Sequence, residues 1–283
     1  MLTGSSARKL KRGKANLLPG RVLVYELGPL CFSEIHDLWD IKKALKFGLL
    51  PGIFLEPDPF IAEKTLKSYS ITYLKEEIQA EALTRNLEGF SRFFNVVSSQ
   101  SGSFIDFSKV ASLASIERTS ARRYYDILID TLVANEIQPF TKSQKRRLIQ
   151  HPRYYFFDVG VLNGSVDNFS ASSDRMGLLF EHLISQLIFS AAKAYDQTIR
   201  LSVYRTEAGA EVDFILERKG EVFAIEVKAS KKIVSTDLHG LKSFIDFYGK
   251  KCQPMIIYLG ENSLHMGGID VLPVAEAMKF LGY

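Results

Sequence analysis

The feature that most constrains the fold is a pair of alternating segments within residues 205–230. Apolar side chains recur at every second position, first at 212, 214 and 216 and then at 223, 225 and 227. This period of two is typical of β-strands. Lys219 and Gly220 separate the two segments, and glycine readily adopts the positive φ angle that a tight turn needs. The pattern therefore predicts a β-hairpin.

Polar residues of this hairpin form a candidate site. Asp213 and Glu226 are separated by twelve residues, a spacing that suits a hairpin whose acids meet at one end. Because successive side chains point to opposite faces, Asp213 shares a face with Glu211, and Glu226 shares one with Lys228. Converging carboxylates suit a divalent cation with oxygen ligands. An adjacent ammonium group can orient a water molecule or stabilise charge that develops on a phosphate.

These residues resemble the pattern of the PD-(D/E)xK nuclease superfamily. The match consists of Asp213, twelve residues and then Glu-Val-Lys at 226–228, preceded by the acid Glu181 in an expected helix. The resemblance implies a nuclease-like α/β fold in which Glu181, Asp213 and Glu226 hold Mg²⁺. It also implies that Lys228 assists the water that attacks a phosphodiester. The proline that precedes the aspartate in the family is absent here, and many members of the superfamily no longer cut. A solvated polar face on an exposed hairpin is the competing interpretation.

A second unit is expected just before this domain, at residues 101–168. Its second helix carries apolar residues at the i, i+3, i+4 and i+7 spacing of an amphipathic helix. Two helices followed by two strands around a basic loop predict a winged-helix domain. The expected elements are helices at 107–114 and 119–133, strands at 136–140 and 154–157, and a basic loop at 142–147.

Basic residues of the winged-helix unit are candidates for contacts with DNA phosphates. Asp126 and Asp130 add negative charge to the same helix and weaken this interpretation. Winged helices also serve as protein-interaction modules, so that alternative stays open. The candidate nucleic-acid-binding residues are Arg118, Arg122, Arg123, Lys145, Arg146 and Arg147.

The whole chain is expected to be a multidomain α/β protein. A helix at 174–194, the hairpin with a strand before it, a helix at 237–248 and a buried strand at 253–259 follow the expected order of the nuclease-like core. The basic segment at 8–14 is a further candidate for phosphate contacts. Four segments are predicted: an ATPase remnant at 1–27, a helical segment at 28–100, the winged helix at 101–168 and the nuclease-like domain at 169–283.

Composition narrows the function classes only slightly. The net charge of +4 permits nucleic-acid binding without requiring it. The two cysteines, Cys31 and Cys252, offer neither a disulfide framework nor zinc-ligand spacing, which favours a reducing cytoplasm. No apolar run approaches the roughly eighteen residues of a membrane-spanning helix, so no membrane partner is expected. The sequence does not indicate an oligomeric state.

The order of motifs along the chain resembles prokaryotic AAA+-type ATPases that carry a C-terminal domain of unknown function. The motifs are Leu-Thr-Gly-Ser-Ser at 2–6, Leu-Pro-Gly-Arg at 18–21, Tyr-Glu-Leu-Gly-Pro-Leu-Cys-Phe-Ser-Glu at 25–34, Tyr-Phe-Phe-Asp-Val-Gly at 155–160, Ala-Glu-Val-Asp-Phe-Ile-Leu at 210–216 and Ile-Glu-Val-Lys at 225–228. The resemblance implies ATP binding in longer relatives. This chain has no Gly-x₄-Gly-Lys-Ser/Thr loop to hold phosphates, so it is not expected to bind ATP by that mechanism. It is expected to be the C-terminal part of such a protein, a split gene product or a truncated form of a longer protein.

Three functions remain open from the sequence. The first is a protein that engages nucleic acid and has a Mg²⁺-dependent phosphodiesterase site in its nuclease-like domain. The second is a non-catalytic interaction or regulatory module that works with an ATPase part not in this chain. The third is an ATPase remnant that needs its missing half in trans.

Overall fold

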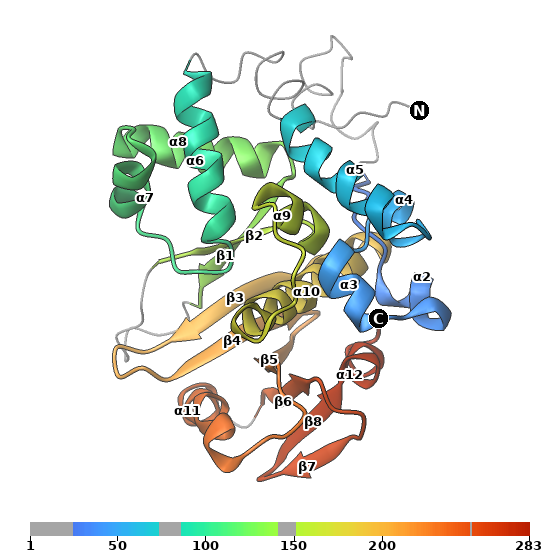
Figure 1. Cartoon of the computed structure of the whole chain (residues 1–283). Coiled ribbons are helices and arrows are strands. Elements are labelled where there is room, and N and C mark those ends of the chain that lie inside the picture. Colours follow the sequence, from blue (N-terminus) through green and yellow to red (C-terminus); the bar gives the residue numbers. More distant parts are fainter. Residues whose placement is uncertain (1–24, 74–85, 141–150, 250) are drawn as a thin grey trace, which may run out of the picture.

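The computed structural model of the protein describes residues 25–73, 86–140, 151–249 and 251–283 (Figure 1). Its centre is a mixed eight-stranded sheet with the order β2-β1-β3-β4-β5-β6-β8-β7. The predicted α/β class is therefore confirmed. The strands are β1 (Ala134–Pro139), β2 (Arg153–Phe156), β3 (Arg200–Arg205), β4 (Glu211–Arg218), β5 (Glu221–Lys228), β6 (Gln253–Tyr258), β7 (Leu264–Met266) and β8 (Ile269–Pro273).

Strands β4 and β5 form the predicted hairpin. They pair antiparallel from Phe214 opposite Ile225 to Arg218 opposite Glu221. The turn residues Lys219 and Gly220 have φ angles of 49° and 85°. Two-residue hairpin turns of type I′ require positive φ at both central positions, which Gly220 supplies without steric strain. The alternating pattern and the turn residues thus lead to the same structure.

The pairing between β3 and β4 contains a bulge beside the candidate site. Ser202 pairs with Ile215 and Tyr204 with Val212, so two steps along β3 correspond to three along β4. Val212 and Ile215 consequently lie in the same hydrophobic cluster although three positions separate them. Strict alternation therefore fails in the stretch that contains Asp213. A bulge of this kind bends the strand and changes the direction of a side chain.

Helices cover both faces of the sheet. Helix α10 (Ser173–Ala194) and helix α12 (Val274–Phe280) share a large hydrophobic cluster with Phe214, Phe223 and Ile225. Residues of β4 and β5 at intervening positions pack instead with α11 (His239–Tyr248), which follows the short 3₁₀ helix η3 (Ser235–Leu238). The hairpin is therefore buried on both faces.

The remaining helices precede α10 in the chain. Helices α3 and α5 pack on α9, while α6, α7 and α8 pack together and α8 also contacts β1 (Figure 1). Their bounds are α2 (Phe32–Ile35), η1 (His36–Leu38), α3 (Ile41–Phe47), α4 (Pro51–Phe54), α5 (Pro59–Thr72), α6 (Leu87–Ser99), α7 (Phe107–Ala114), α8 (Arg118–Asp130) and α9 (Val159–Ser165).

The segment predicted to be a winged helix contains α7, α8, β1 and β2 in the expected order. Helix α8 ends three residues before the predicted end, because Leu132 has a φ angle of 62° and leaves the helical conformation. Strand β1 pairs antiparallel with β2 but also parallel with β3, through Gln138 opposite Ser202 and the next pair of residues. The two strands thus extend the main sheet. The winged-helix assignment stays a prediction.

A buried aspartate joins three helices. Asp158 is fully buried and caps the start of α9. Its carboxylate accepts hydrogen bonds from Val161 N at 3.0 Å, from Leu49 N at 2.7 Å and from Gln186 Nε2 at 2.7 Å. Burial raises the pKa of Asp158, and these donors oppose that rise. The carboxylate therefore fixes the end of α3 and the start of α9 on α10.

A buried histidine fixes β2 on the same helix. His182 Nε2 lies 2.7 Å from the carbonyl oxygen of Phe156, and burial lowers the pKa of His182 to about 4. The ring is therefore neutral near pH 7, and Nε2 must carry the proton because a carbonyl can only accept. Gln186 supplies a second tie, since its Oε1 accepts from Val159 N at 2.8 Å. These bonds hold β2, and with it Arg153, beside the α10 residue Glu181.

Candidate functional site

The hairpin places Asp213 and Glu226 close together. Asp213 lies just before the paired stretch of β4, and Glu226 lies just beyond Ile225 on β5. The backbone N–H of Val227 donates to Asp213 Oδ2 at 2.8 Å. Both residues are almost fully buried, at 9% and 8% exposure. A charged carboxylate so far from water needs a partner.

Glu181 reaches this region from the neighbouring helix. It lies on α10 beside the buried residues Phe180, His182 and Leu183, and its side chain is half-buried. Helix α10 packs against β5, so Glu181 comes to the edge of the same acidic region. The helix was predicted from its apolar stripe. The sequence does not predict which residues contact Glu181.

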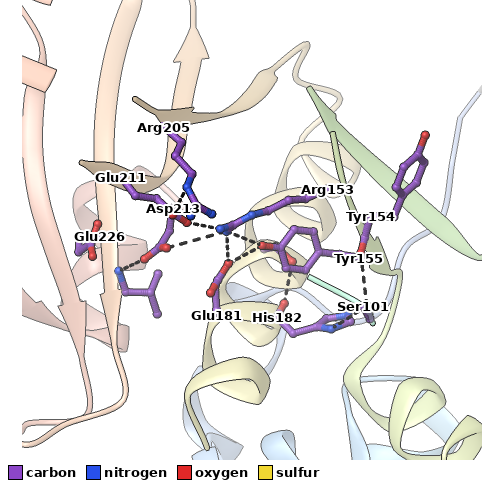
Figure 2. Close-up of polar contacts among 12 residues, drawn as sticks. Ser101, Arg153, Tyr154, Tyr155, Glu181, His182, Arg205, Glu211, Asp213 and Glu226 are labelled. Carbon is purple, nitrogen blue, oxygen red and sulfur yellow. Dashed lines mark hydrogen bonds and ion pairs between the residues drawn. The ribbon is translucent and has the colours of Figure 1, made fainter. Parts of the chain in front are cut away.

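Arg153 is the central residue of the site (Figure 2). It is 6% exposed, and its Nη1 lies 2.7 Å from Glu181 Oε1 and 4.0 Å from Asp213 Oδ1. Its Nη2 contacts Glu211 Oε1. Tyr155, two residues along the same strand, donates its hydroxyl to Glu181. One guanidinium group thus contacts acids from both α10 and β4. We name Arg153, Glu181, Glu211 and Asp213 the arginine–carboxylate cluster.

Aromatic and basic neighbours enclose the arginine–carboxylate cluster. The guanidinium groups of Arg153 and Arg205 lie 4.2 and 4.8 Å from the centre of the Phe104 ring. Arg205 Nε is 3.4 Å from Glu211 Oε2. Cation–π contacts and shared carboxylates are both stronger away from water. The buried Arg153 therefore has a fixed position, while Arg205 reaches Glu211 from the more exposed side.

Glu226 and Lys228 form a separate pair. Lys228 Nζ donates to Glu226 Oε1 at 2.7 Å. Figure 2 shows Glu226 on the other side of Asp213 from Arg153, outside the contacts of the arginine. Glu226 Oε2 is buried and has no hydrogen-bond partner among the described residues. A buried oxygen without a donor is a site where a cation or a water molecule binds favourably.

Electrostatics make the acids hard to ionise together. Burial raises the pKa of Asp213 well above its ordinary value, and the charges of Glu181 and Glu226 raise it further. Burial likewise raises the pKa of Glu226 to about 7, although Lys228 opposes this. Burial would lower the pKa of Arg153, but the neighbouring Tyr155 hydroxyl and the surrounding carboxylates raise it overall. The cluster therefore depends on Arg153 for its charge balance.

The residues predicted to hold Mg²⁺ are close in space but not assembled around one point. Within residues 25–73, 86–140, 151–249 and 251–283, no group of three or more His, Cys, Asp or Glu side chains is arranged to hold a metal ion. The cation beside Glu181 and Asp213 is instead the guanidinium of Arg153. As arranged, these residues do not fit a bound metal. The metal roles of Glu181, Asp213 and Glu226, and the catalytic role of Lys228, stay predictions.

Arg153 and Tyr155 were absent from the predicted site, and Glu211 was given no role. A partial signal did exist, because Arg153 directly precedes the expected strand at 154–157 and lies two positions before Tyr155. The two side chains share a face because the strand begins one residue earlier than predicted. The position of that strand in the sheet could not be read from the sequence. It depends on the parallel pairing of β1 with β3, between segments more than sixty residues apart.

The predicted nucleic-acid-binding residues are only partly described. Arg118, Arg122 and Arg123 are exposed on α8. The guanidinium of Arg122 lies 5.6 Å from the Phe107 ring centre, and that of Arg123 lies 5.4 Å from the Tyr124 ring centre. Their exposure leaves them accessible to a polyanion. The basic residues Lys145, Arg146 and Arg147, the segment 8–14 and most of the predicted ATPase remnant lie outside the described residues.

Comparisons with known proteins identify two regions of the chain. Residues 38–173 match a domain of unknown function, DUF8612, and residues 176–277 match a second one, DUF4143. The boundary between the two matches falls at the start of α10. Arg153 belongs to the first region, whereas Glu181, Glu211 and Asp213 belong to the second. The site therefore combines residues of both regions.

Similar proteins occur in bacteria and archaea. A protein of Mycobacterium tuberculosis and one of Mycobacterium bovis, both named as uncharacterized, are each 23% identical over 287 residues, covering 100% of this chain and 63% of theirs. An uncharacterized protein of Methanocaldococcus jannaschii is 26% identical over 207 residues, covering 65% of this chain and 45% of that protein. The chain thus spans less than two thirds of the length of these relatives. Among the described residues, no helix is long and apolar enough to cross a membrane.

Proposed function

We propose that this chain is a non-catalytic module that engages nucleic acid as part of an ATPase-type protein. The position of Arg153 supports a non-catalytic role. Arg153 is buried and lies between the carboxylates of Glu181 and Glu211. A buried guanidinium that is hydrogen-bonded to two carboxylates is held strongly. The acids are thereby charge-balanced without a metal, and the nuclease-like residues act in folding and positioning.

The exposed arginines of α8 support a role in binding nucleic acid. Arg118, Arg122 and Arg123 lie within two turns of one helix, and all three are exposed. Clustered arginines bind phosphates through charge and bidentate hydrogen bonds. The ATPase part is proposed to lie outside this chain, because no phosphate-binding loop occurs in its 283 residues. The greater length of the relatives is compatible with this arrangement.

Replacing Arg118, Arg122 and Arg123 together by alanine is expected to weaken binding to duplex DNA or RNA by roughly tenfold or more at about 100 mM salt. The reason is the loss of up to three phosphate contacts, each of which releases counterions from the nucleic acid. The slope of log K against log salt concentration should also become shallower, because fewer phosphate contacts release fewer counterions. Fluorescence anisotropy with labelled duplexes in EDTA measures both quantities.

The matched control removes the same charge elsewhere. Lys42, Lys64 and Lys279 are exposed on α3, α5 and α12, so their joint replacement by alanine should change affinity by less than about threefold. Equal losses in the two triple variants would mean that net charge alone attracts nucleic acid. Absence of binding at low salt would contradict the proposal and favour a module that binds protein.

A metal-dependent phosphodiesterase is the second candidate function. The buried and unpartnered Glu226 Oε2, next to Lys228, favours it. Hydrolysis of DNA or RNA that needs Mg²⁺ or Mn²⁺ and disappears in Asp213→Asn would identify this function and contradict the non-catalytic role. Retained nucleic-acid binding without such hydrolysis would support the module.

A further inference from the structure

The arginine–carboxylate cluster is built from two different regions of the chain. Arg153 begins β2, inside the region 38–173, and its partners Glu181 and Glu211 lie inside the region 176–277. Phe104 also comes from the first region. The Arg153 guanidinium lies over its ring, and the two residues form an isolated β-bridge. The first region therefore supplies the positive charge, and the second supplies the acids.

The guanidinium of Arg153 lies between the acids of the arginine–carboxylate cluster. Its Nη1 is 2.7 Å from Glu181 and 4.0 Å from Asp213, and its Nη2 contacts Glu211. Its Nε is buried without a hydrogen-bond partner among the described residues. A divalent cation held by the same carboxylates would lie within a few ångströms of this positive charge. At such a distance the repulsion is strong away from water, so the two cations exclude one another.

Hydrogen bonds from α10 fix the backbone that follows Arg153. The carbonyl oxygen of Phe156 accepts from His182 at 2.7 Å, and Val159 N donates to Gln186 Oε1 at 2.8 Å, both in buried positions. The packing of Arg153 on Phe104 restricts the side chain as well. The arginine is therefore positioned by the fold and does not depend on its ion pairs alone.

We propose that Arg153 is a resident counter-cation that takes the place of a divalent cation beside Glu181 and Asp213, the two acids of the second region that its Nη1 faces. The acids keep the ligand chemistry that Mg²⁺ and Mn²⁺ require, and the unpartnered Glu226 Oε2 is a free oxygen donor beside them. The positive charge from the first region takes the place of the metal. The inference concerns the acidic site considered in the proposed function, but it does not depend on nucleic-acid binding.

The test is thermal unfolding of Arg153→Gln with and without about 1 mM MnCl₂. The variant loses the competing charge, so Mn²⁺ should raise its melting temperature by roughly 5 °C or more, as a ligand of the folded state does. Wild type and Arg153→Lys, which keep a positive charge, should shift by less than about 1 °C. The shift should vanish in Arg153→Gln combined with Asp213→Asn. Arg205→Gln, which removes an arginine that contacts Glu211 from the exposed side, should not shift.

The outcomes are distinct. Equal shifts in wild type and Arg153→Gln would show that the arginine does not exclude metal, and no shift in a folded Arg153→Gln would show that these acids bind no divalent cation. Either result overturns the inference and leaves the nucleic-acid proposal standing. If Arg153→Gln does not fold alone, Arg153→Gln with Glu211→Gln removes one acid along with the arginine. Folding of either variant that is recovered by Mn²⁺ supports the inference, and failure of both to respond contradicts it.

Discussion

Replacing Arg153 by methionine is expected to lower the free energy of unfolding by about 3–5 kcal/mol at pH 8, because removing one partner of a buried ion pair leaves the other charges uncompensated. The arginine is 6% exposed and contacts both Glu181 and Glu211, so water cannot replace it. Methionine replaces the aliphatic part of the arginine side chain and removes the guanidinium. The measured loss therefore reports the removal of the guanidinium with its ion pairs.

The loss should be smaller at pH 5 than at pH 8. Burial, together with the charges of Glu181 and Glu226, already raises the pKa of Asp213 in the folded protein, and burial raises that of Glu226 to about 7. Arg153 opposes the rise at Asp213 and Glu181, so its removal raises their folded pKa values further. A group whose folded pKa lies above its unfolded value stabilises the protein at low pH, and this contribution is lost as the pH rises through the folded pKa.

Urea unfolding at the two pH values measures this difference. Arg205→Met is the matched control, because Arg205 also contacts Glu211 and Phe104 but has a side chain that is 37% exposed. Its loss should stay below about 1 kcal/mol at both pH values. A loss for Arg153→Met that is equally small, or that does not depend on pH, would mean that the arginine does not balance the acids.

Asp158→Ala is expected to lower the free energy of unfolding by about 3–5 kcal/mol. The substitution leaves three buried donors, Leu49 N, Val161 N and Gln186 Nε2, without their acceptor, and each lost acceptor costs about 1–3 kcal/mol. Water cannot take the place of the lost acceptor, since Asp158 is fully buried between α3, α9 and α10. Urea unfolding monitored by circular dichroism gives the value.

Asp106→Ala serves as the control for the loss of a helix cap. Asp106 caps α7 by accepting from Ser108 N at 2.8 Å and Lys109 N at 3.2 Å, but it is exposed. Its replacement should cost about 1 kcal/mol, the ordinary value for a surface cap. Similar losses in the two variants would mean that Asp158 acts only as a cap and does not join the helices.

The sequence predicts the parts of this fold that depend on local periodicity. The β4–β5 hairpin follows from residues at every second position and from Lys219-Gly220, which form the turn. Helix α10 follows from its apolar stripe, and Glu181 is found on it as expected. These elements are recoverable because the pattern that specifies each one lies within the element itself.

Other parts depend on contacts between distant residues. The bulge that displaces Asp213 from strict alternation arises from the register of β4 against β3, and the hairpin sequence carries no sign of it. The contact between Arg153 and Glu181 needs β2 to join the sheet through β1 and needs His182 to hold it there. Only the tertiary structure brings these groups together. The proximity of Asp213 and Glu226 on the hairpin could therefore be predicted, and the contacts of Arg153 could not.

We propose that an internal arginine, and not a metal ion, balances the charges of Glu181, Glu211 and Asp213. A crystal structure of the wild-type chain soaked in MnCl₂, with anomalous diffraction data, tests it most directly. No anomalous peak is expected between Glu181, Asp213 and Glu226, and Arg153 should remain within hydrogen-bond distance of Glu181. A manganese ion ligated by Asp213 and Glu226, with Arg153 displaced from Glu181, would contradict it.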